Sequence, residues 1–166
     1  VDAGGRLQGV VHDGGSIGIG GTLDWETADG ITNRPIDGFI VIEQGARLDA
    51  SGTTAALDID GKGRQPVATD GGSIVLRSAN GVQLDGDLRA RAGGNGAQGG
   101  TLGVAFGGAV YSASDADPAV LVARELSLTQ HSADIVRPVD GAPAYGQAWL
   151  SAEQVAALNE DIVWMV

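Results

Sequence analysis

The chain has 166 residues, a net charge of −11 and no cysteine, and glycine supplies 28 of its residues. This length allows one domain with one core, and the absence of cysteine excludes a disulfide scaffold and a thiolate metal site. The acidic balance argues against a nucleic-acid partner, since phosphate binding needs a basic face, and no apolar run reaches the ~18 residues of a membrane-spanning helix.

Asp-Gly and Asn-Gly pairs divide the chain into short segments. Seven Asp-Gly pairs occur, from Asp13-Gly14 to Asp140-Gly141, and Asn80-Gly81 and Asn95-Gly96 add two more. Each pair suits a tight turn, because glycine accepts a positive φ and Asp or Asn can hydrogen-bond its own backbone. The spacing therefore predicts short strands joined by turns along most of the chain.

Period-two alternation of apolar residues between these turns predicts where the strands lie. The alternating pairs, in chain order, are Ile17 and Ile19, Phe39 and Val41, Ile74 and Leu76, Val82 and Leu84, Leu88 and Ala90, Leu102 and Val104, and Leu126 and Leu128. Near the C-terminus, Ser151–Leu158 predicts one short helix, with Ser151 as its cap and Gln154 completing a capping box. Residues Ile162–Val166 predict a final strand.

A repeat underlies these strands. Gly14-Gly15-Ser16-Ile17 recurs as Gly71-Gly72-Ser73-Ile74 and as Gly99-Gly100-Thr101-Leu102; the second interval is 28 residues, and the first, 57 residues, is close to two such units. A second echo pairs Leu48–Gly52 with Leu88–Gly93. A short unit of three strands predicts a parallel β-helix, in which each coil buries its inner face only by stacking on the next. The competing fold is a β-sandwich, which has no reason to repeat a whole unit.

The repeated segments resemble the shaft of the filamentous haemagglutinin family, the large exoproteins of bacterial two-partner secretion. The resemblance rests on Gly71–Leu76, Leu84–Gly94 and Gly99–Leu102, and extends to Ala123–Thr129 and Leu150–Val155. It implies a right-handed parallel β-helix, secreted to the surface of a Gram-negative bacterium through a partner outer-membrane transporter. Members of the family act in adhesion, biofilm formation or contact-dependent competition, and in most of them the shaft spaces or displays a binding tip.

We therefore expect residues 1–166 to form a single β-helical domain of a longer exoprotein, with less regular loops projecting from the coils over 106–150. Exposed aromatics on such loops suit weak binding to host or bacterial surface glycans or proteins, so Tyr111, Tyr145 and Trp149 are the candidate surface-binding residues. The alternative is that these aromatics seal the loops against the core. End-to-end self-association is also expected, because a segment of a stack exposes unpaired strand edges.

Patterns for catalysis and for metal binding are incomplete in this sequence. Asp58–Gly63 partly matches a calcium loop but has lysine at a ligand position, and Gly93–Gln98 departs from a calcium-binding repeat where aspartate is required. His131, Ser132 and Asp134 lie close in sequence, but neighbours in a strand point to opposite faces, which disfavours a catalytic triad. We therefore expect no enzyme activity, no cofactor, no metal and no nucleic-acid partner. The alternatives are a carbohydrate-active β-helix enzyme of polysaccharide lyase or hydrolase type and the stalk of a contact-dependent growth inhibition exoprotein.

Overall fold

The computed structural model describes residues 4–27, 30–35, 38–106, 110–111, 120–121, 124–135, 145–156 and 163–165. Strands dominate this part of the chain, so the all-β prediction is confirmed. It also contains one short α-helix near the C-terminus, α1 (Ala152–Ala156), as the capping pattern predicts, and one 3₁₀ helix, η1 (Ser132–Asp134).

Three of the sheets are built only from parallel pairs. Sheet I has the order β1 (Ser16–Ile19), β8 (Ser73–Ser78), β11 (Thr101–Phe106) and β16 (Val163–Met165). Sheet II has the order β4 (Phe39–Ile42), β9 (Gly81–Leu84), β15 (Gln147–Ser151) and β14 (Glu125–Thr129). Sheet III contains β5 (Arg47–Asp49) and β10 (Asp87–Arg89).

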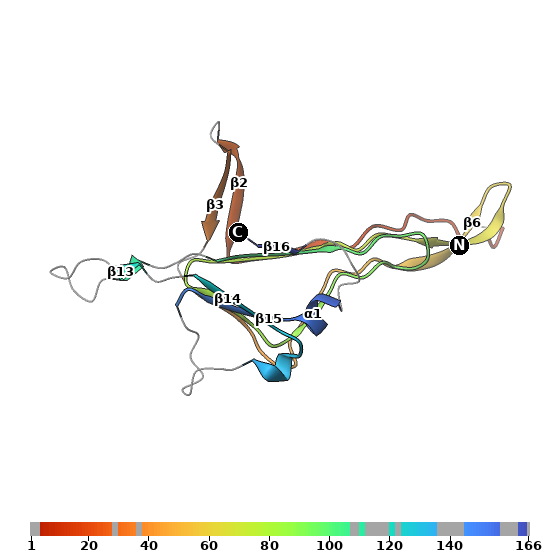
Figure 1. The fold of residues 1–166 in the computed structure, drawn as a ribbon. Coiled ribbons are helices and arrows are strands. Elements are labelled where there is room, and N and C mark those ends of the chain that lie inside the picture. Colours follow the sequence, from red (N-terminus) through yellow and green to blue (C-terminus); the bar gives the residue numbers. More distant parts are fainter. Residues whose placement is uncertain are drawn as a thin grey trace.

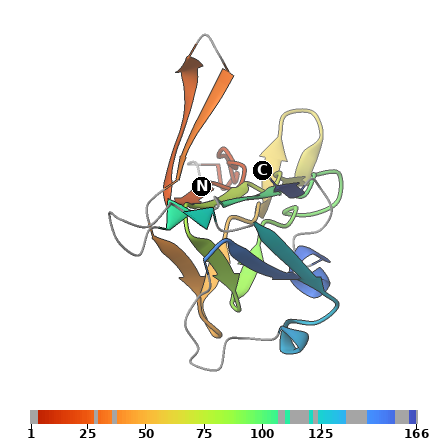
Figure 2. The same ribbon diagram turned by 60° about the vertical axis from the view of Figure 1, so that its left-hand side comes forward.

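The other described strands form antiparallel pairs outside these sheets. The pairs are β2 (Gly21–Thr27) with β3 (Gly30–Pro35), β6 (Thr54–Ile59) with β7 (Gly63–Ala68), and β12 (Val110–Tyr111) with β13 (Val120–Leu121). The β2–β3 pair stands away from the sheets, and β6 and β7 project from the end that also carries the start of the described chain (Figure 1). The same two projections are seen after rotation (Figure 2).

The chain visits sheets I, II and III in a fixed order, first as β1, β4 and β5 and then as β8, β9 and β10. Equivalent repeat positions lie opposite one another, since Ile17 pairs with Ile74 and Ile74 pairs with Leu102. The repeat is therefore confirmed as a register of parallel strands. The expectation that its 57-residue interval holds two units is wrong, because β1 pairs directly with β8, and the β2–β3 and β6–β7 hairpins account for the additional length.

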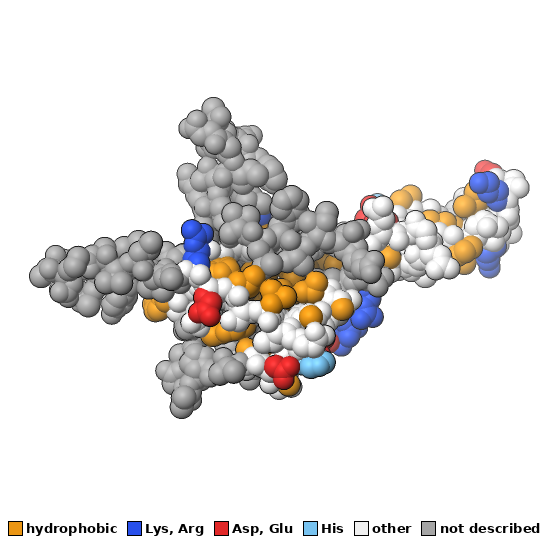
Figure 3. All heavy atoms as spheres, in the orientation of Figure 1, with side chains coloured by type: hydrophobic (Ala, Val, Ile, Leu, Met, Phe, Trp, Pro, Cys, Tyr) orange, Lys and Arg blue, Asp and Glu red, His pale blue; other side chains and the backbone are white. Residues whose placement is uncertain are grey.

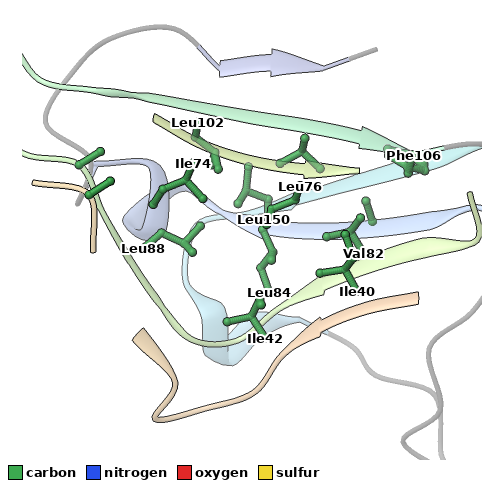
Figure 4. Close-up of a cluster of buried hydrophobic side chains, with 14 residues drawn as sticks. Ile40, Ile42, Ile74, Leu76, Val82, Leu84, Leu88, Leu102, Phe106 and Leu150 are labelled. Atoms are coloured by element: carbon green, nitrogen blue, oxygen red, sulfur yellow. The ribbon is translucent and has the colours of Figure 1, made fainter. Parts of the chain in front are cut away.

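The core lies between the three parallel sheets (Figure 4). It consists of Ile40, Ile42, Ala50, Ile74, Leu76, Val82, Leu84, Leu88, Ala90, Leu102, Val104, Phe106, Ala148 and Leu150. Alternation along each strand places these residues inward, as in β8, where Ile74 and Leu76 are completely buried. In β4 the inward residues are not the predicted pair Phe39 and Val41. Ile40 and Ile42 are the buried residues of this strand, whereas Val41 is 40% exposed.

Glycine is required at the residue that precedes β8 and at the residue that precedes β11 in sheet I. A Cβ atom on Gly72 would lie 1.9 Å from the carbonyl oxygen of Gly15, and one on Gly100 would lie 1.9 Å from the carbonyl oxygen of Gly72. No atom within 4 Å would meet a Cβ on Gly15, the equivalent position of the first strand. Both Gly72 and Gly100 therefore direct their missing side chain toward the preceding strand of the stack, where only backbone fits.

Aspartates that precede the strands of sheet I accept hydrogen bonds from the backbone of the segment that precedes the neighbouring strand. Asp13 Oδ1 accepts a hydrogen bond from the Asp70 amide at 3.1 Å, and Asp70 Oδ1 accepts one from the Gln98 amide at 2.7 Å. The Asp-Gly pairs at Asp13 and Asp70 thus do more than form a turn, because their carboxylates join neighbouring strands of the stack.

The outward faces of β5 and β10 carry opposite charges at paired positions. Arg47 pairs with Asp87 and Asp49 pairs with Arg89, and the Arg47 guanidinium lies 3.4 Å from the Asp87 carboxylate. Hydrogen bonds from Ser51 lower the pKa of Asp49, and the two arginines lower it further. Exposed ion pairs of this kind contribute about 0–1 kcal/mol each, so they favour the observed register more than they add stability.

Sheet II departs from the order of the chain. β14 precedes β15 in sequence, yet β15 lies between β9 and β14. The span 106–150, where we expected projecting loops, therefore supplies two strands of a core sheet within its described part, in addition to the β12–β13 pair.

Replacing Gly72 by alanine is expected to destabilise the fold by about 1–3 kcal/mol, because the new methyl group meets a backbone carbonyl that cannot move freely. Gly15→Ala, at the equivalent repeat position with open space around it, is the matched control and should change the free energy of unfolding by less than about 0.5 kcal/mol. Urea denaturation of both variants is the measurement, and equal losses would contradict the stacking of the corner.

Leu88 and Arg89 test the direction of the side chains in β10. Leu88 is 1% exposed, so Leu88→Asp buries an unpaired charge and should cost about 3 kcal/mol or more. The neighbouring Arg89 points outward, and Arg89→Gln should cost less than about 1 kcal/mol. The same urea titration compares the two variants, and a larger loss for Arg89→Gln would reverse the assigned faces.

Candidate functional site

A polar groove of about 220 Å³ runs beside β10, where η1 and α1 pack near the turn between β9 and β10. Its polar lining comes from Asp85, Asp87, Arg89, Arg91, Ser132 and Glu153. Carboxylates and guanidinium groups both face the groove, so it offers donors and acceptors with no single sign of charge. In the view of Figure 3, apolar side chains gather over the middle of the described surface, and acidic and basic side chains lie next to each other at the tip of the right-hand projection.

Strand alternation places one wall of this groove. In β10 and the two residues after it, 90 and 91, alternate side chains point into the core. Leu88 and Ala90 are buried, so the side chains of Asp87, Arg89 and Arg91 point outward into the groove. Arg89 lies 3.3 Å from the Asp87 carboxylate, which also accepts from Arg47. The Asp87 carboxylate and the Arg89 guanidinium on this wall are therefore already engaged in ion pairs within the protein.

Glu153 forms the opposite wall and ties η1 to α1. Its carboxylate accepts hydrogen bonds from the Ser132 amide at 2.9 Å and from the Ser132 hydroxyl, and His131 Nδ1 lies 3.1 Å from Oε2. These contacts, with those from Ser132 as the larger contribution, lower the pKa of Glu153 to about 2. Glu153 is consequently ionised across the ordinary pH range and acts as the anchor of the η1 segment.

Gln154 fixes α1 above the groove. The Ser151 amide donates to Gln154 Oε1 at 2.9 Å, and Ser151 Oγ accepts from the Gln154 amide at 3.3 Å, so the predicted capping box is confirmed. The side-chain amide of Gln154 donates to the carbonyl oxygens of Leu84 and Gly86 at 2.8 and 3.2 Å. One buried side chain therefore both caps the helix and joins it to the β9–β10 turn.

The arrangement of Ser132, His131 and Glu153 differs from that of a nucleophilic triad. In a triad the histidine lies between the hydroxyl and the acid and accepts the proton of the hydroxyl. Here Glu153 lies between the two, and the Ser132 hydroxyl donates to the carboxylate. The geometry supports anchoring of a loop. Glu153 lies 22 positions after His131 and 21 positions after Ser132 in the sequence, so no local sequence pattern predicts these contacts.

The candidate aromatic residues occupy different environments. Tyr145 is 45% exposed, and its ring packs edge-on against Phe39 with centroids 4.9 Å apart. Trp149 in β15 is only 7% exposed, so it presents little of its ring to a partner. Tyr111 lies in β12, and its side chain falls outside the described residues. Among the three candidates, Tyr145 is therefore the one that the structure describes as exposed.

The acidic turn considered as a calcium loop is the tip of the β6–β7 hairpin. Asp58 accepts hydrogen bonds from the Leu7 amide and from the Arg64 guanidinium, and Asp60 pairs with Arg6. Among the described residues, no three His, Cys, Asp or Glu side chains lie close enough together to hold a metal ion. Within the same residues, no helix is long and apolar enough to cross a membrane.

Comparison of the chain with protein-family models, with curated proteins and with solved structures gives no match.

Glu153→Gln is expected to destabilise the protein at neutral pH, because the amide replaces an ionised acceptor of three contacts. The folded-state pKa of Glu153 is depressed, so its contribution is present above the ordinary carboxyl range and is lost as the pH falls toward about 2. The difference in urea midpoint between the wild type and Glu153→Gln should therefore shrink steadily below pH ~4. Glu43→Gln, on an exposed loop, is the control and should show no such difference.

Proposed function

We propose that this chain is a structural segment of a parallel β-helix, the shaft of a secreted exoprotein similar to the filamentous haemagglutinins. In this role it holds a binding tip or projecting hairpins at a fixed distance from a surface. The observation that carries the proposal is the register of the parallel strands, in which Ile17, Ile74 and Leu102 stack in one row.

The order of the strands supports a β-helix. The first two passages of the chain, β1 to β5 and β8 to β10, each contribute one strand to sheet I, one to sheet II and one to sheet III, and every pairing within these sheets is parallel. Within the β8–β10 passage the connections are only two residues long, 79–80 and 85–86. A solenoid is the simplest path that satisfies short connections and parallel pairing together, since parallel strands of one sheet need a long crossover between them.

Features at both ends of the stack support continuation beyond the described coils. At the β1 end, the space next to Gly15 is open, although the equivalent space at Gly72 and Gly100 is filled by the preceding coil. At the β14 end, Leu128 lies opposite the buried Leu150 yet is 57% exposed. An inward-facing leucine left uncovered, with an open strand edge beside it, suits the addition of another coil.

The segments that resemble the family coincide with the regular part of the stack, because Gly71–Leu76 covers the first four residues of β8 and Leu84–Gly94 contains β10. We therefore extend the proposal to secretion through a partner outer-membrane transporter and to display on the surface of a Gram-negative bacterium. Surface glycans or proteins are the proposed targets, and the projecting β2–β3 and β6–β7 hairpins and Tyr145 are the surfaces available to meet them. A stalk in contact-dependent growth inhibition would use the same scaffold.

The groove beside β10 is the feature that favours the alternative, a carbohydrate-active enzyme, because three carboxylates line it. Glycoside hydrolysis needs one acid that keeps its proton near neutral pH. The pKa of Glu153 moves in the opposite direction, and Asp87 is held by two arginines. The residues that line the groove are therefore better suited to joining β10, η1 and α1 to one another than to catalysis. We propose a protein without enzyme activity.

A shaft segment should associate end to end, with a coil of one copy stacking on β1 of the next. Light scattering over a wide dilution series is expected to show concentration-dependent growth for the wild type. Gly15→Ala should abolish this growth while leaving the unfolding midpoint unchanged, because its methyl group occupies the place of the incoming backbone. Leu128→Lys, at the opposite end, should have the same effect by placing a charge on the uncovered core.

Gly18→Ala is the matched control for this experiment, since it adds the same methyl group to the outer face of β1 where nothing lies within 4 Å. It should associate like the wild type. A wild type that stays monomeric at every concentration, or a Gly15→Ala variant that assembles equally well, would contradict the shaft proposal.

A further inference from the structure

We propose that Asn95-Gly96 is a site of spontaneous covalent modification, at which the asparagine of the folded protein deamidates, whereas the other described asparagine–glycine pair, Asn80-Gly81, is protected by the fold. The two dipeptides are identical in sequence and differ in reactivity because their surroundings differ. The chemistry of this turn does not depend on the role of the chain as a shaft.

The reaction needs only water. The backbone nitrogen of the glycine attacks Cγ of the asparagine, forming an N–Cγ bond, and the Cγ–Nδ2 bond breaks, so that ammonia leaves with the amide proton of the glycine. Water then opens the cyclic imide at either of its carbonyl carbons and leaves aspartate or isoaspartate. Glycine favours the attack because it carries no Cβ to obstruct the approach and because its backbone adopts many conformations.

The turn at Asn95 leaves both reacting groups accessible. The Ala97 amide donates to the Gly94 carbonyl oxygen at 3.2 Å, so Asn95 and Gly96 occupy the two central positions of a tight turn. Gly96 has a φ of 86°, and both residues are exposed. No hydrogen bond to the Gly96 amide occurs among the described residues, and the nucleophilic nitrogen is therefore not engaged in any bond that the reaction must first break.

The surroundings of Asn80 are the reverse. Its side chain is 8% exposed, and both its own amide and that of Gly81 donate to Ser78 Oγ, at 3.1 and 2.9 Å. Gly81 also begins β9 and is held between Phe39 of β4 and Gln147 of β15. Reaching the cyclic imide at this position would require breaking these bonds and moving a strand at the centre of sheet II.

Aspartate–glycine pairs can form the same imide more slowly, and the fold restrains the described ones as well. The amides of Gly14, Gly71 and Gly86 all donate to carbonyl oxygens in neighbouring parts of the stack. At Asp60-Gly61 the turn resembles that of Asn95, but Arg6 pairs with the Asp60 carboxylate, and the reaction would have to break this contact. Asn95 is consequently the most reactive of the described sites.

Modification of Asn95 would alter the link between β10 and β11. The isoaspartate product adds a carbon to the backbone of the turn and a negative charge to it. Three residues further on, the Gln98 amide is held by Asp70, and Gly100 packs against Gly72. The modified turn therefore adds strain and negative charge close to the corner that fixes the spacing of the coils.

The test is to incubate the whole folded chain at mildly alkaline pH and to follow both asparagines by peptide mapping with mass spectrometry. We expect Asn95 to convert to a mixture of aspartate and isoaspartate many times faster than Asn80. The same incubation in concentrated urea should bring the two rates together, because both pairs then lie in an unfolded chain.

Two variants complete the test. Asn95→Gln removes the reactive group and should abolish the fast conversion, and Ser78→Ala should raise the rate at Asn80 by removing the acceptor of the Gly81 amide. Circular dichroism shows whether each variant is folded. Equal rates at Asn95 and Asn80 in the folded wild type, or an Asn95 that is stable when folded and converts only in urea, would overturn the proposal.

Discussion

Contact between backbones sets how closely the strands of sheet I approach one another where they begin. The carbonyl oxygen of Gly15 lies where Gly72 would carry a side chain, and the carbonyl oxygen of Gly72 lies where Gly100 would carry one. Strands that approach this closely can stack at the spacing of a hydrogen-bonded sheet, about 4.8 Å. Any larger residue would push the strands of sheet I apart at this point, and the rows of core leucines and isoleucines would then lose their contacts.

Charges on the outside reinforce the same register. The exchange of signs between Arg47 and Asp49 on β5 and Asp87 and Arg89 on β10 brings unlike charges together at each pair. A shift by one residue would bring core and surface residues to the wrong faces, and a shift by two would place like charges opposite each other. The inner face thus provides the stability of the stack, and the outer face penalises the nearest alternative pairing that keeps the core inward.

The parts of the fold that follow from local pattern could be predicted from the sequence, and those that depend on distant contacts could not. The Gly-Gly-Ser-Ile repeat and the Ser151–Gln154 capping box each place their residues by spacing alone, and both are found in the structure. The two hairpins within the first interval do not follow from the sequence, because the alternating pairs and the repeat lie outside their strands and give no indication of antiparallel pairing there. The anchoring of Ser132 by Glu153 depends on η1 and α1 meeting in space, which no short motif encodes.

The position of β14 has a consequence for how the chain acquires its structure. The strands β8, β9 and β10 can pair with partners already made, so a chain that emerges from its N-terminus can assemble them in sequence. β14 cannot, because its neighbour in sheet II is β15, which is made later and must enter between β14 and β9. Such a non-local step closes a loop before it gains its contacts and is slow for that reason. β14 and β15 should therefore join sheet II late and together, after β4 and β9 have paired.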